Sequence, residues 1–280
     1  MRPELEKKVE RAIRLLQSIP QDGDIELSYS GGKDSDVILE LAKMAGIPYR
    51  AIYKNTTIDP KGTIAHAREM GAEVIHPKKT FFQLVSEKGF PSRFARFCCS
   101  ALKEYKICDR AIQGIRRVES RKRAENYKEP EMCRVYSTKE KVKVYLPILE
   151  WTDQDVEEFI KERNIKCHPL YYRDGGQFDV TKRLGCVGCP LQSRRKRIQE
   201  FKDNPKFLKA WIRAGQKRFK SEAYQNGDSK YHFKDAFEVM GYQLYCDNID
   251  DFKEKTYTLF GEFDWKEFLE KEFNIDMGDI

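Results

Sequence analysis

"DIELSYSGGKDSDVILELAKMAG", residues 24–46, joins a predicted strand to a predicted helix through two adjacent glycines. Residues 24–30 have the composition of a strand, whereas residues 34–46 carry apolar side chains at helical spacing and end on a glycine. Such a turn presents backbone N–H groups and the positive end of a helix to an anion. Gly31 and Gly32 let a phosphate approach the backbone closely. The stretch therefore predicts a phosphate-binding loop at the end of a strand.

The polar side chains of this loop suit a phosphate-bearing ligand. Lys33 supplies a positive charge, and Ser30 and Ser35 offer hydroxyls to phosphate oxygens. Asp34 lies at the start of the helix, where it can cap the helix or help to hold Mg²⁺. The pattern is neither G-x-x-x-x-G-K-[ST] nor G-x-G-x-x-G. A capped turn between strand and helix would explain one serine and one glycine, but not S-G-G-K-D-S as a set.

The chain after the loop continues to alternate between strand and helix. Residues 49–55 indicate a strand, residues 60–71 a helix and residues 72–77 another strand. This alternation predicts an α/β fold, a Rossmann-like parallel sheet with helices on both faces. Ligands of such sheets lie at the carboxyl ends of the strands, where the loop, Asn55 and His76 all fall.

We expect three parts along the chain: an N-terminal helix over 1–22, a nucleotide-binding domain with a cysteine cluster over 23–190, and a helical C-terminal lobe over 191–280. Thr152 is expected to cap a helix whose first turn carries two aspartates. The N-terminus has no uninterrupted apolar run, so we expect neither a signal peptide nor a membrane span, and a cytoplasmic location.

The net charge of the 280-residue chain is +7, and the excess of basic residues falls in two segments, 116–124 and 193–202. A basic patch suits phosphate-rich ligands, including nucleic acid, but a solvated helix face explains such a segment equally well.

Eight cysteines in a cytoplasmic chain are expected to be reduced thiols rather than disulfides. Cys98 and Cys99 are adjacent, and Cys186 and Cys189 form a C-x-x-C in a glycine-containing turn. A C-x-x-C turn points two sulfurs at one ion, and a second pair completes a shell of four thiolates. Zinc and an iron–sulfur cluster both fit this description. A redox pair and buried small hydrophobic residues are the alternatives.

"SYSGGKDS" resembles the PP-loop of the ATP pyrophosphatase, or adenine nucleotide alpha hydrolase-like, superfamily, whose members cleave ATP between the α and β phosphates. The further motifs "RFCCSALKEYKI", "GIRRVESRKRA", "LPILEWTDQDVEEFI", "HPLYYRDGG" and "LGCVGCP" follow in an order similar to that of the phosphoadenosine phosphosulfate reductase family. The resemblance covers residues 22–192. It implies the adenine nucleotide alpha hydrolase-like fold and an adenine nucleotide as ligand.

The resemblance also implies roles for particular residues. The four cysteines that it assigns to a four-iron, four-sulfur cluster beside the nucleotide are Cys98, Cys99, Cys186 and Cys189. The residues that it places around the nucleotide are Ser28, Ser30, Gly31, Gly32, Lys33, Asp34, Ser35, Asn55, Gly114, Glu119 and Arg123. The residues expected to act in catalysis are Lys33, Asp34, Arg116 and Arg117. Lys103 and the arginines would line the phosphate or sulfate end, because guanidinium groups suit such oxygens.

Two departures from the family pattern bear on the reaction. Sulfonucleotide reductases attack sulfur with a cysteine in a C-terminal Glu-Cys-Gly-Leu-His motif, whereas Cys246 is the last cysteine here. Those reductases generally carry a degenerate loop, whereas this loop keeps the lysine and aspartate that hold a β–γ pyrophosphate. Both departures favour ATP as substrate.

We therefore predict an enzyme that cleaves ATP to AMP and pyrophosphate and activates an acceptor for sulfur transfer, as in nucleic-acid thiolation. Its expected cofactors are ATP, Mg²⁺ and the four-iron, four-sulfur cluster. A nucleic-acid acceptor, a sulfur donor such as a cysteine desulfurase, and a homo-oligomer are the partners considered. The alternatives are a true adenylyl-sulfate or phosphoadenylyl-sulfate reductase that releases sulfite, and a nucleotide-dependent nucleic-acid-binding module with a structural cluster.

Overall fold

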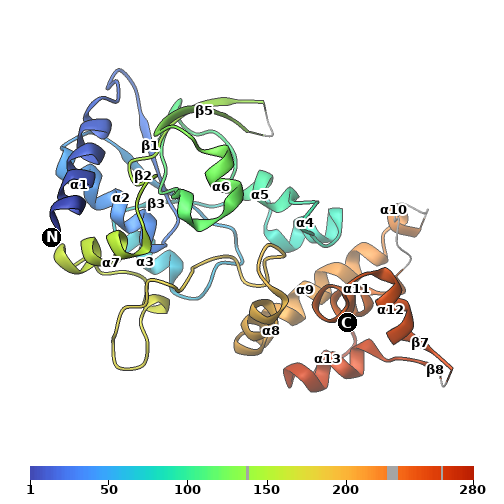
Figure 1. The fold of residues 1–280 in the computed structure, drawn as a ribbon. Coiled ribbons are helices and arrows are strands. Elements are labelled where there is room, and N and C mark those ends of the chain that lie inside the picture. The colour runs from blue at the N-terminus through green and yellow to red at the C-terminus, as the bar shows by residue number, and fades with distance from the viewer. Residues whose placement is uncertain (137–138, 226–232, 260) are drawn as a thin grey trace. The chain divides into compact units, whose positions relative to one another are not determined.

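The computed structural model describes residues 1–136, 139–225, 233–259 and 261–280 of the chain. Its main feature is a six-stranded sheet with the strand order β3-β2-β1-β4-β6-β5, flanked by helices (Figure 1). The strands are β1 (Ile25–Tyr29), β2 (Arg50–Lys54), β3 (Glu73–Ile75), β4 (Arg110–Ile112), β5 (Glu131–Val135) and β6 (Lys141–Tyr145). This arrangement confirms the predicted α/β fold.

The first four pairings of the sheet are parallel, and only β5 runs antiparallel, against β6. The central strand β1 is almost wholly buried, as expected for a strand with both faces covered. The edge strand β5 instead alternates between exposed and half-buried side chains. The antiparallel edge strand is an element that the sequence analysis did not predict.

The helices of this part of the chain are α1 (Pro3–Gln17), α2 (Lys33–Ala45), α3 (Thr63–Glu69), α5 (Phe97–Leu102), α6 (Arg121–Asn126) and α7 (Asp153–Glu162), with 3₁₀ turns at Arg117–Glu119 and Pro169–Tyr171. The helix α1 buries Leu5, Val9, Ala12 and Leu16, whose spacing defines one helical face. It packs on α2, which in turn packs on β1 and α7. Thr152 caps α7 as predicted.

The strand order places a topological switch point at β1. The chain moves from β1 to β2 and β3 on one side, and β4 then pairs with the other side of β1. In open α/β sheets, a ligand binds at the carboxyl ends of the strands that flank such a point. The loops after β1 and β4 therefore form the expected ligand site.

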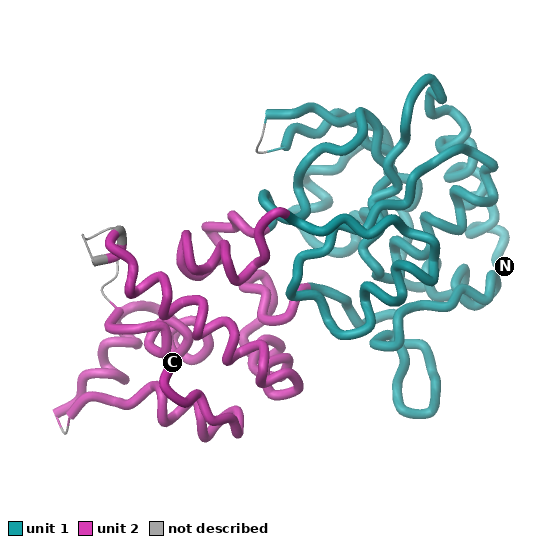
Figure 2. The backbone as a smooth tube through the Cα atoms, turned by 180° about the vertical axis from the view of Figure 1, so that it is seen from behind, with its two compact units in different colours: residues 1–77, 99–185 teal, residues 78–98, 186–280 magenta. Residues whose placement is uncertain are grey.

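The chain forms two compact units (Figure 2). Unit 1 comprises residues 1–77 and 99–185, and unit 2 comprises residues 78–98 and 186–280. The helices and short strands of unit 2 are α4 (Phe81–Lys88), α8 (Arg194–Asp203), α9 (Pro205–Phe219), α10 (Glu222–Gln225), α11 (Ala236–Tyr245), α12 (Ile249–Thr256), β7 (Tyr257–Thr258), β8 (Gly261–Glu262) and α13 (Trp265–Phe273). Because this grouping follows packing alone, the sequence-based division at residue 190 stays a prediction.

Aromatic side chains form the core of unit 2. The ring of Trp211 on α9 lies 4.6 Å from that of Phe81 on α4 and 5.9 Å from that of Phe201 on α8, measured between centroids. Since Phe81 precedes Trp211 by 130 positions, a segment far away in the sequence, residues 78–98, completes this core.

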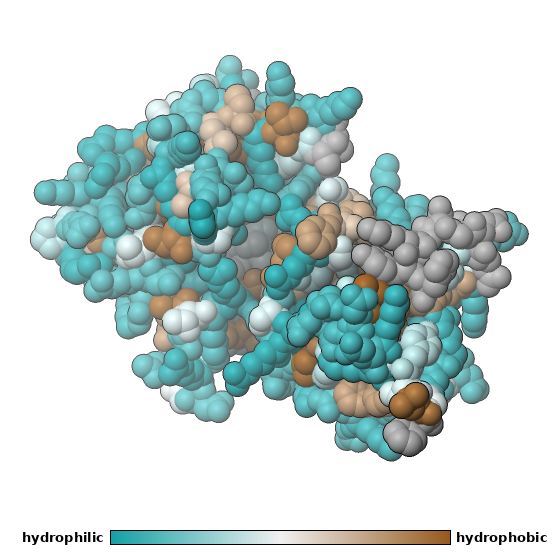
Figure 3. All heavy atoms as spheres, turned by 45° about the vertical axis from the view of Figure 1, so that its right-hand side comes forward, coloured by the Kyte–Doolittle hydropathy of each residue, from teal (hydrophilic) through white to brown (hydrophobic). Residues whose placement is uncertain are grey.

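The face of the molecule drawn in Figure 3 is mostly hydrophilic, with hydrophobic side chains in small separate groups. Within the described ranges, no helix is both long enough and apolar enough to cross a membrane.

Candidate functional site

The loop between β1 and α2 has a shape that only glycine permits. Gly31 adopts a φ of +75°, and a Cβ atom there would lie 2.9 Å from Cγ2 of Thr63. A Cβ atom on Gly32 would lie 3.1 Å from the hydroxyl oxygen of Tyr171. Both glycines therefore leave the backbone of the loop bare, as the prediction of a phosphate-binding loop requires.

The serine hydroxyls of the loop hold its shape. The hydroxyl of Ser35 donates to the carbonyl oxygen of Gly32 over 2.7 Å and lies 3.3 Å from the hydroxyl oxygen of Ser30. Ser28 differs, because its hydroxyl donates to the buried carboxylate of Glu26 over 2.8 Å. Ser30 and Ser35 therefore lie together at the loop, whereas the hydroxyl of Ser28 is hydrogen-bonded to a residue of its own strand, β1.

Lys33 begins α2 and is almost completely buried, with 3% of its side chain exposed. Its Nζ atom lies 3.3 Å from the carbonyl oxygen of Lys182 and 3.6 Å from Oδ2 of Asp34. Burial lowers the pKa of Lys33, and the charge of Asp34 opposes that shift. The ammonium group is therefore held beside the loop by neutral and anionic oxygens that a phosphate oxygen can replace.

Arg116 lies in the loop after β4 and forms ion pairs with the first turns of α2 and α7. Its side chain is 1% exposed, and its Nε atom lies 2.7 Å from Oδ1 of Asp34. A second guanidinium nitrogen, Nη2, lies 2.8 Å from Oδ1 of Asp153 at the start of α7. Nearby, a Cβ atom on Gly114 would lie 2.8 Å from the carbonyl oxygen of Asp34, so only glycine fits there. Arg116 and Gly114 therefore set the position of Asp34.

The other candidates in the basic segment have different partners. Arg117 forms an ion pair with Glu150 and donates through Nε to the carbonyl oxygen of Tyr127 over 2.8 Å. Glu119 forms an ion pair with Arg123. Burial lowers the pKa of Arg123. Arg116 is thus bound to the loop aspartate, whereas the contacts of Arg117 hold neighbouring backbone together.

Asn55 lies at the carboxyl end of β2, as predicted. Its Nδ2 atom is 3.1 Å from Nδ1 of His76, which follows β3, and its Oδ1 atom accepts from the backbone N–H of Thr57 over 2.8 Å. Lys103 directly follows α5, and its Nζ atom lies 3.9 Å from Oδ1 of Asp59, in the segment between β2 and α3. These contacts bring Asn55 and His76 together and shape the loop that leads to α3.

A buried polar cluster behind the loop was missed by the sequence analysis. Asp36 has no exposed surface, accepts a hydrogen bond from Tyr29, and has Oδ1 3.2 Å from Nε2 of His66. Burial raises the pKa of Asp36, and its hydrogen bonds oppose that shift. The ring of His66 meets that of His168 edge to face, with 5.7 Å between centroids. The signal for this cluster in the sequence was Asp36 itself, an acidic residue at the start of a helix face that is otherwise apolar.

The turn that contains Cys186 and Cys189 is tightly supported by α8. Its central Gly188 has a φ of +74°, and a Cβ atom there would lie 2.3 Å from Cζ of Phe201. The N–H of Gly188 donates to Glu200 over 2.9 Å, and its carbonyl oxygen accepts from Nε of Arg197 over 3.1 Å. Burial lowers the pKa of Arg197 to about 10, with Cys189 and Glu200 opposing the shift. Arg197 therefore holds a positive charge next to Cys189.

The second cysteine pair is arranged differently. Cys98 and Cys99 are consecutive residues of α5, and the boundary between the two units falls between them. Consecutive residues of a helix point about 100° apart. No group of three or more His, Cys, Asp or Glu side chains in the described part of the chain is arranged to hold a metal. Cluster ligation by the four cysteines therefore stays a prediction.

Comparison with known proteins identifies the family. The model of the phosphoadenosine phosphosulfate reductase domain matches residues 24–192, which is more than half of the chain. The chain belongs to the phosphoadenosine phosphosulfate reductase domain family. The resemblance predicted from the sequence is thereby confirmed, and the matched range contains both the loop and the Cys186–Cys189 turn.

Curated relatives of this family member include an uncharacterised protein of Methanocaldococcus jannaschii, which is 29% identical over 67% of this chain and 46% of its own length. Another is sulfate adenylyltransferase subunit 2 of Brucella ovis, which is 29% identical over 51% of this chain and 59% of its own length. The chain thus spans about half the length of the curated relatives that it matches.

Solved structures of limited similarity include a phosphoadenylyl-sulfate reductase of Candida auris, with a TM-score of 0.43, 15% identity, and coverage of 66% of this chain and 96% of that chain. The U34-tRNA thiolase of Methanococcus maripaludis, solved with its [4Fe-4S] cluster, has a TM-score of 0.40 and 15% identity, with 82% of each chain covered. At these TM-scores the likeness carries no functional argument.

A sulfonucleotide reductase attacks sulfur with a cysteine near its C-terminus. In this family member that nucleophile would have to be Cys246, the last cysteine of the chain. Its side chain is 1% exposed, and Sγ lies 3.9 Å from the carbonyl oxygen of Gly241. Burial raises the pKa of Cys246 to about 11. At neutral pH the residue is therefore a protonated thiol, which is a poor nucleophile.

Proposed function

We propose that the chain binds Mg-ATP at residues 30–35, cleaves it between the α and β phosphates, and passes the adenylyl group to an acceptor oxygen as the activating step of a sulfur transfer. The observation that carries this proposal is the buried ammonium of Lys33 beside a loop in which Gly31 and Gly32 leave the backbone bare. A fixed positive charge next to bare backbone amides suits a pyrophosphate leaving group.

The chemistry follows from the contacts of the loop. The Lys33 ammonium would exchange its 3.3 Å contact with the Lys182 carbonyl for a phosphate oxygen and stabilise the charge that develops on pyrophosphate. Buried Arg116 fixes Asp34 by its 2.7 Å ion pair and so keeps α2 aligned with the loop after β4. The attack of the acceptor oxygen on the α phosphorus forms one P–O bond as the bond to the β phosphate breaks.

Mg²⁺ fits this arrangement through Asp34. One oxygen of that carboxylate, Oδ1, is paired with Arg116 over 2.7 Å, whereas Oδ2 has the longer 3.6 Å approach of Lys33. Asp34 is also partly exposed, so Oδ2 is the oxygen that would hold the ion. When bound, Mg²⁺ compensates the charge of the phosphates.

The iron–sulfur cluster is proposed on the donor chemistry of the four cysteines. Cys186 and Cys189 fit such a group, because the turn between them is fixed by Gly188 and lies beside a charged guanidinium. Cys98 and Cys99 would provide the second pair. When bound, the cluster supplies iron held by the four thiolates.

The names of relatives support adenylyl transfer as the class of reaction. The Brucella relatives are sulfate adenylyltransferase subunits, and the matched domain is named for a sulfonucleotide. We propose nucleic acid as the acceptor, a cysteine desulfurase as the source of sulfur, and self-association of the chain as further partners of this activity.

The proposal is tested with anaerobically purified protein. We expect tight calorimetric binding of Mg-ATP and weak binding of adenylyl sulfate and phosphoadenylyl sulfate. Pyrophosphate should be released when acceptor is supplied, and AMP should follow when sulfide is added as the nucleophile that displaces it. Preference for either sulfonucleotide, with sulfite release, would contradict the proposal and favour the reductase activity.

The cysteine assignment predicts four iron and four sulfide per chain in the anaerobic protein. Replacing Cys186 or Cys189 by alanine is expected to abolish iron binding, because the remaining thiolates cannot complete the shell. The matched control is Cys133→Ala, since Cys133 is exposed and outside the proposed set. Stoichiometric zinc without iron, or iron retained in both variants, would show the assignment to be wrong.

A further inference from the structure

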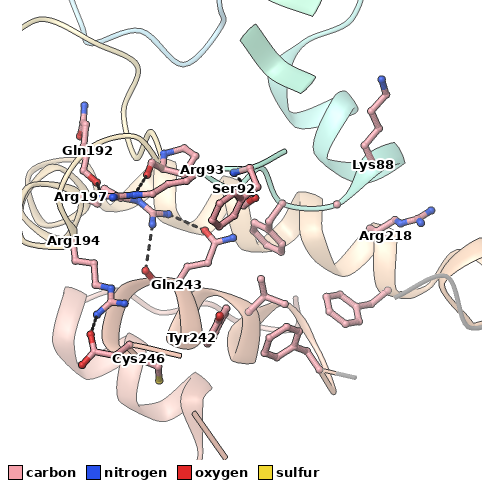
Figure 4. Close-up of a pocket in the computed structure, with 18 of the residues that line it drawn as sticks. Lys88, Ser92, Arg93, Gln192, Arg194, Arg197, Arg218, Tyr242, Gln243 and Cys246 are labelled. Atoms are coloured by element: carbon pink, nitrogen blue, oxygen red, sulfur yellow. Dashed lines mark hydrogen bonds and ion pairs between the residues drawn. The ribbon is translucent and has the colours of Figure 1, made fainter. Parts of the chain in front are cut away.

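Unit 2 contains a pocket of about 860 Å³ that the proposed ATP chemistry does not use. It is lined by residues of α4, α8, α9 and α11 together with the segments before α5 and α8 (Figure 4). Its volume is in the range of pockets that enclose ligands of nucleotide size.

The lining of this pocket is strongly basic. The lining residues that the structure describes include five cationic side chains and a single carboxylate, that of Asp247, which pairs with Arg194 over 2.5 Å. Arg93 donates to the carbonyl oxygens of Pro190 and Gln192, and Arg197 donates to the Gly188 and Gln243 oxygens. Among the described residues, neither Arg93 nor Arg197 forms an ion pair with a carboxylate. The pocket therefore offers positive charge to an anionic ligand.

The cations are spread along the pocket. Figure 4 shows Lys88 and Arg218 on one side and Arg194 and Arg197 on the opposite side. A single phosphate group would need donors that converge on one point, whereas the backbone of a polyanion meets charges in succession. From residue 186 to residue 220 the chain has eleven Lys or Arg and two Asp or Glu, so the surrounding surface is basic as well.

Aromatic rings accompany these charges. Among the residues with a described placement, the rings that line the pocket belong to Phe90, Phe94, Phe219, Tyr224, Phe233 and Tyr242. Phe94 is 100% exposed and lies on a turn in which the Ser92 hydroxyl accepts the N–H groups of Phe94 and Ala95 over 3.2 and 3.0 Å. An exposed ring on a fixed turn beside Arg93 is suited to stacking on a base.

We propose that this pocket binds single-stranded nucleic acid, with phosphates on Lys88, Arg93 and Arg218 and a base stacked on Phe94. This pocket is separate from the loop of residues 30–35. The inference rests on the proposed function in one respect only, namely that the bound strand is the acceptor. RNA and DNA share the chemistry that the pocket recognises, so the experiment includes both.

The test measures fluorescence anisotropy of labelled single-stranded RNA, single-stranded DNA and duplex DNA with the full chain, without ATP. We expect a single strand to bind more tightly than the duplex. The double variant Lys88→Glu, Arg218→Glu should weaken binding at least tenfold and reduce the slope of log K against log salt by about 1.4, because two phosphate contacts are lost. Phe94→Ala should weaken binding by about tenfold, and Phe94→Tyr should restore it.

The matched control is Lys7→Glu, Lys43→Glu, which makes the same change in net charge on exposed residues of unit 1. It is expected to leave the affinity within about twofold. Equal weakening by both double variants, unchanged binding by Phe94→Ala, or no binding by the wild type would overturn the inference. ATP cleavage measured on the same preparations separates this result from a failure of the proposed function, because the variants leave the loop of residues 30–35 intact.

Discussion

Replacing Lys33 by alanine is expected to lower the rate of pyrophosphate release about 10²–10³-fold, the loss seen when one preorganised charge or donor is removed from an active site. The reason is that the buried ammonium is the charge held beside the bare glycine loop. The matched control, Lys43→Ala, removes an exposed lysine from the last turn of the same helix and should leave the rate unchanged. Equal rates for wild type and Lys33→Ala would exclude the proposed role of this side chain.

The pH dependence provides a second measurement on the same variant. Burial lowers the pKa of Lys33 below its ordinary value of 10.5, so its charge is lost at a lower pH than that of an exposed lysine. Activity and Mg-ATP affinity should therefore fall as pH rises through this lowered pKa, and Lys33→Ala should lack that fall. Between the lowered and the ordinary pKa the unfolded chain binds more protons at this position than the folded chain, so the contribution of Lys33 to stability rises with pH.

Replacing Gly188 by alanine is expected to destabilise unit 2 by about 2–4 kcal/mol and to abolish iron binding at Cys186 and Cys189. The left-handed backbone costs an alanine about 1 kcal/mol, and overpacking against the Phe201 ring adds about 1–3 kcal/mol. Urea unfolding followed by tryptophan fluorescence measures the first effect, because Trp211 lies against Phe201. Iron analysis of the anaerobic protein measures the second.

The control for this change is Gly278→Ala, also in unit 2. Gly278 has a φ of +61° with nothing within 4 Å of the added Cβ atom, so that variant carries the backbone cost without the steric clash. It should lose about 1 kcal/mol and keep its iron. If Gly188→Ala were no less stable than Gly278→Ala, the close packing of the turn on α8 would not contribute to the stability of unit 2.

Much of the fold of unit 1 could be predicted because its signals are local. The alternation of strand and helix between residues 24 and 77 fixed the fold class, and the pair Gly31 and Gly32 located the loop. The role of Asp34 could be anticipated only in part, because its partner Arg116 lies 82 positions away and the 2.7 Å ion pair between them depends on the pairing of β1 with β4.

The remaining features depend on contacts that no local pattern encodes. The edge strand β5 was missed because its alternating side chains resemble a polar loop when its partner β6 is not known. The cluster at Asp36 was missed because burial of a carboxylate depends on Tyr29 and His66 being nearby in space. The basic segment 193–202 was equally compatible with a solvated helix, and only the pocket lining distinguishes Arg194 and Arg197 from its other cations.

The discontinuity of unit 2 has a consequence for synthesis on the ribosome. Phe81 emerges 130 residues before Trp211, the ring on which it packs at 4.6 Å. At a translation rate of about 5–20 residues per second, Phe81 is synthesised roughly 6–26 s before Trp211 on α9. During that interval the chain also completes the strands of unit 1, so the nascent protein exposes an unpaired aromatic helix while its sheet is already able to form. Chaperone dependence during translation should therefore concentrate on residues 78–98 rather than on the sheet of unit 1.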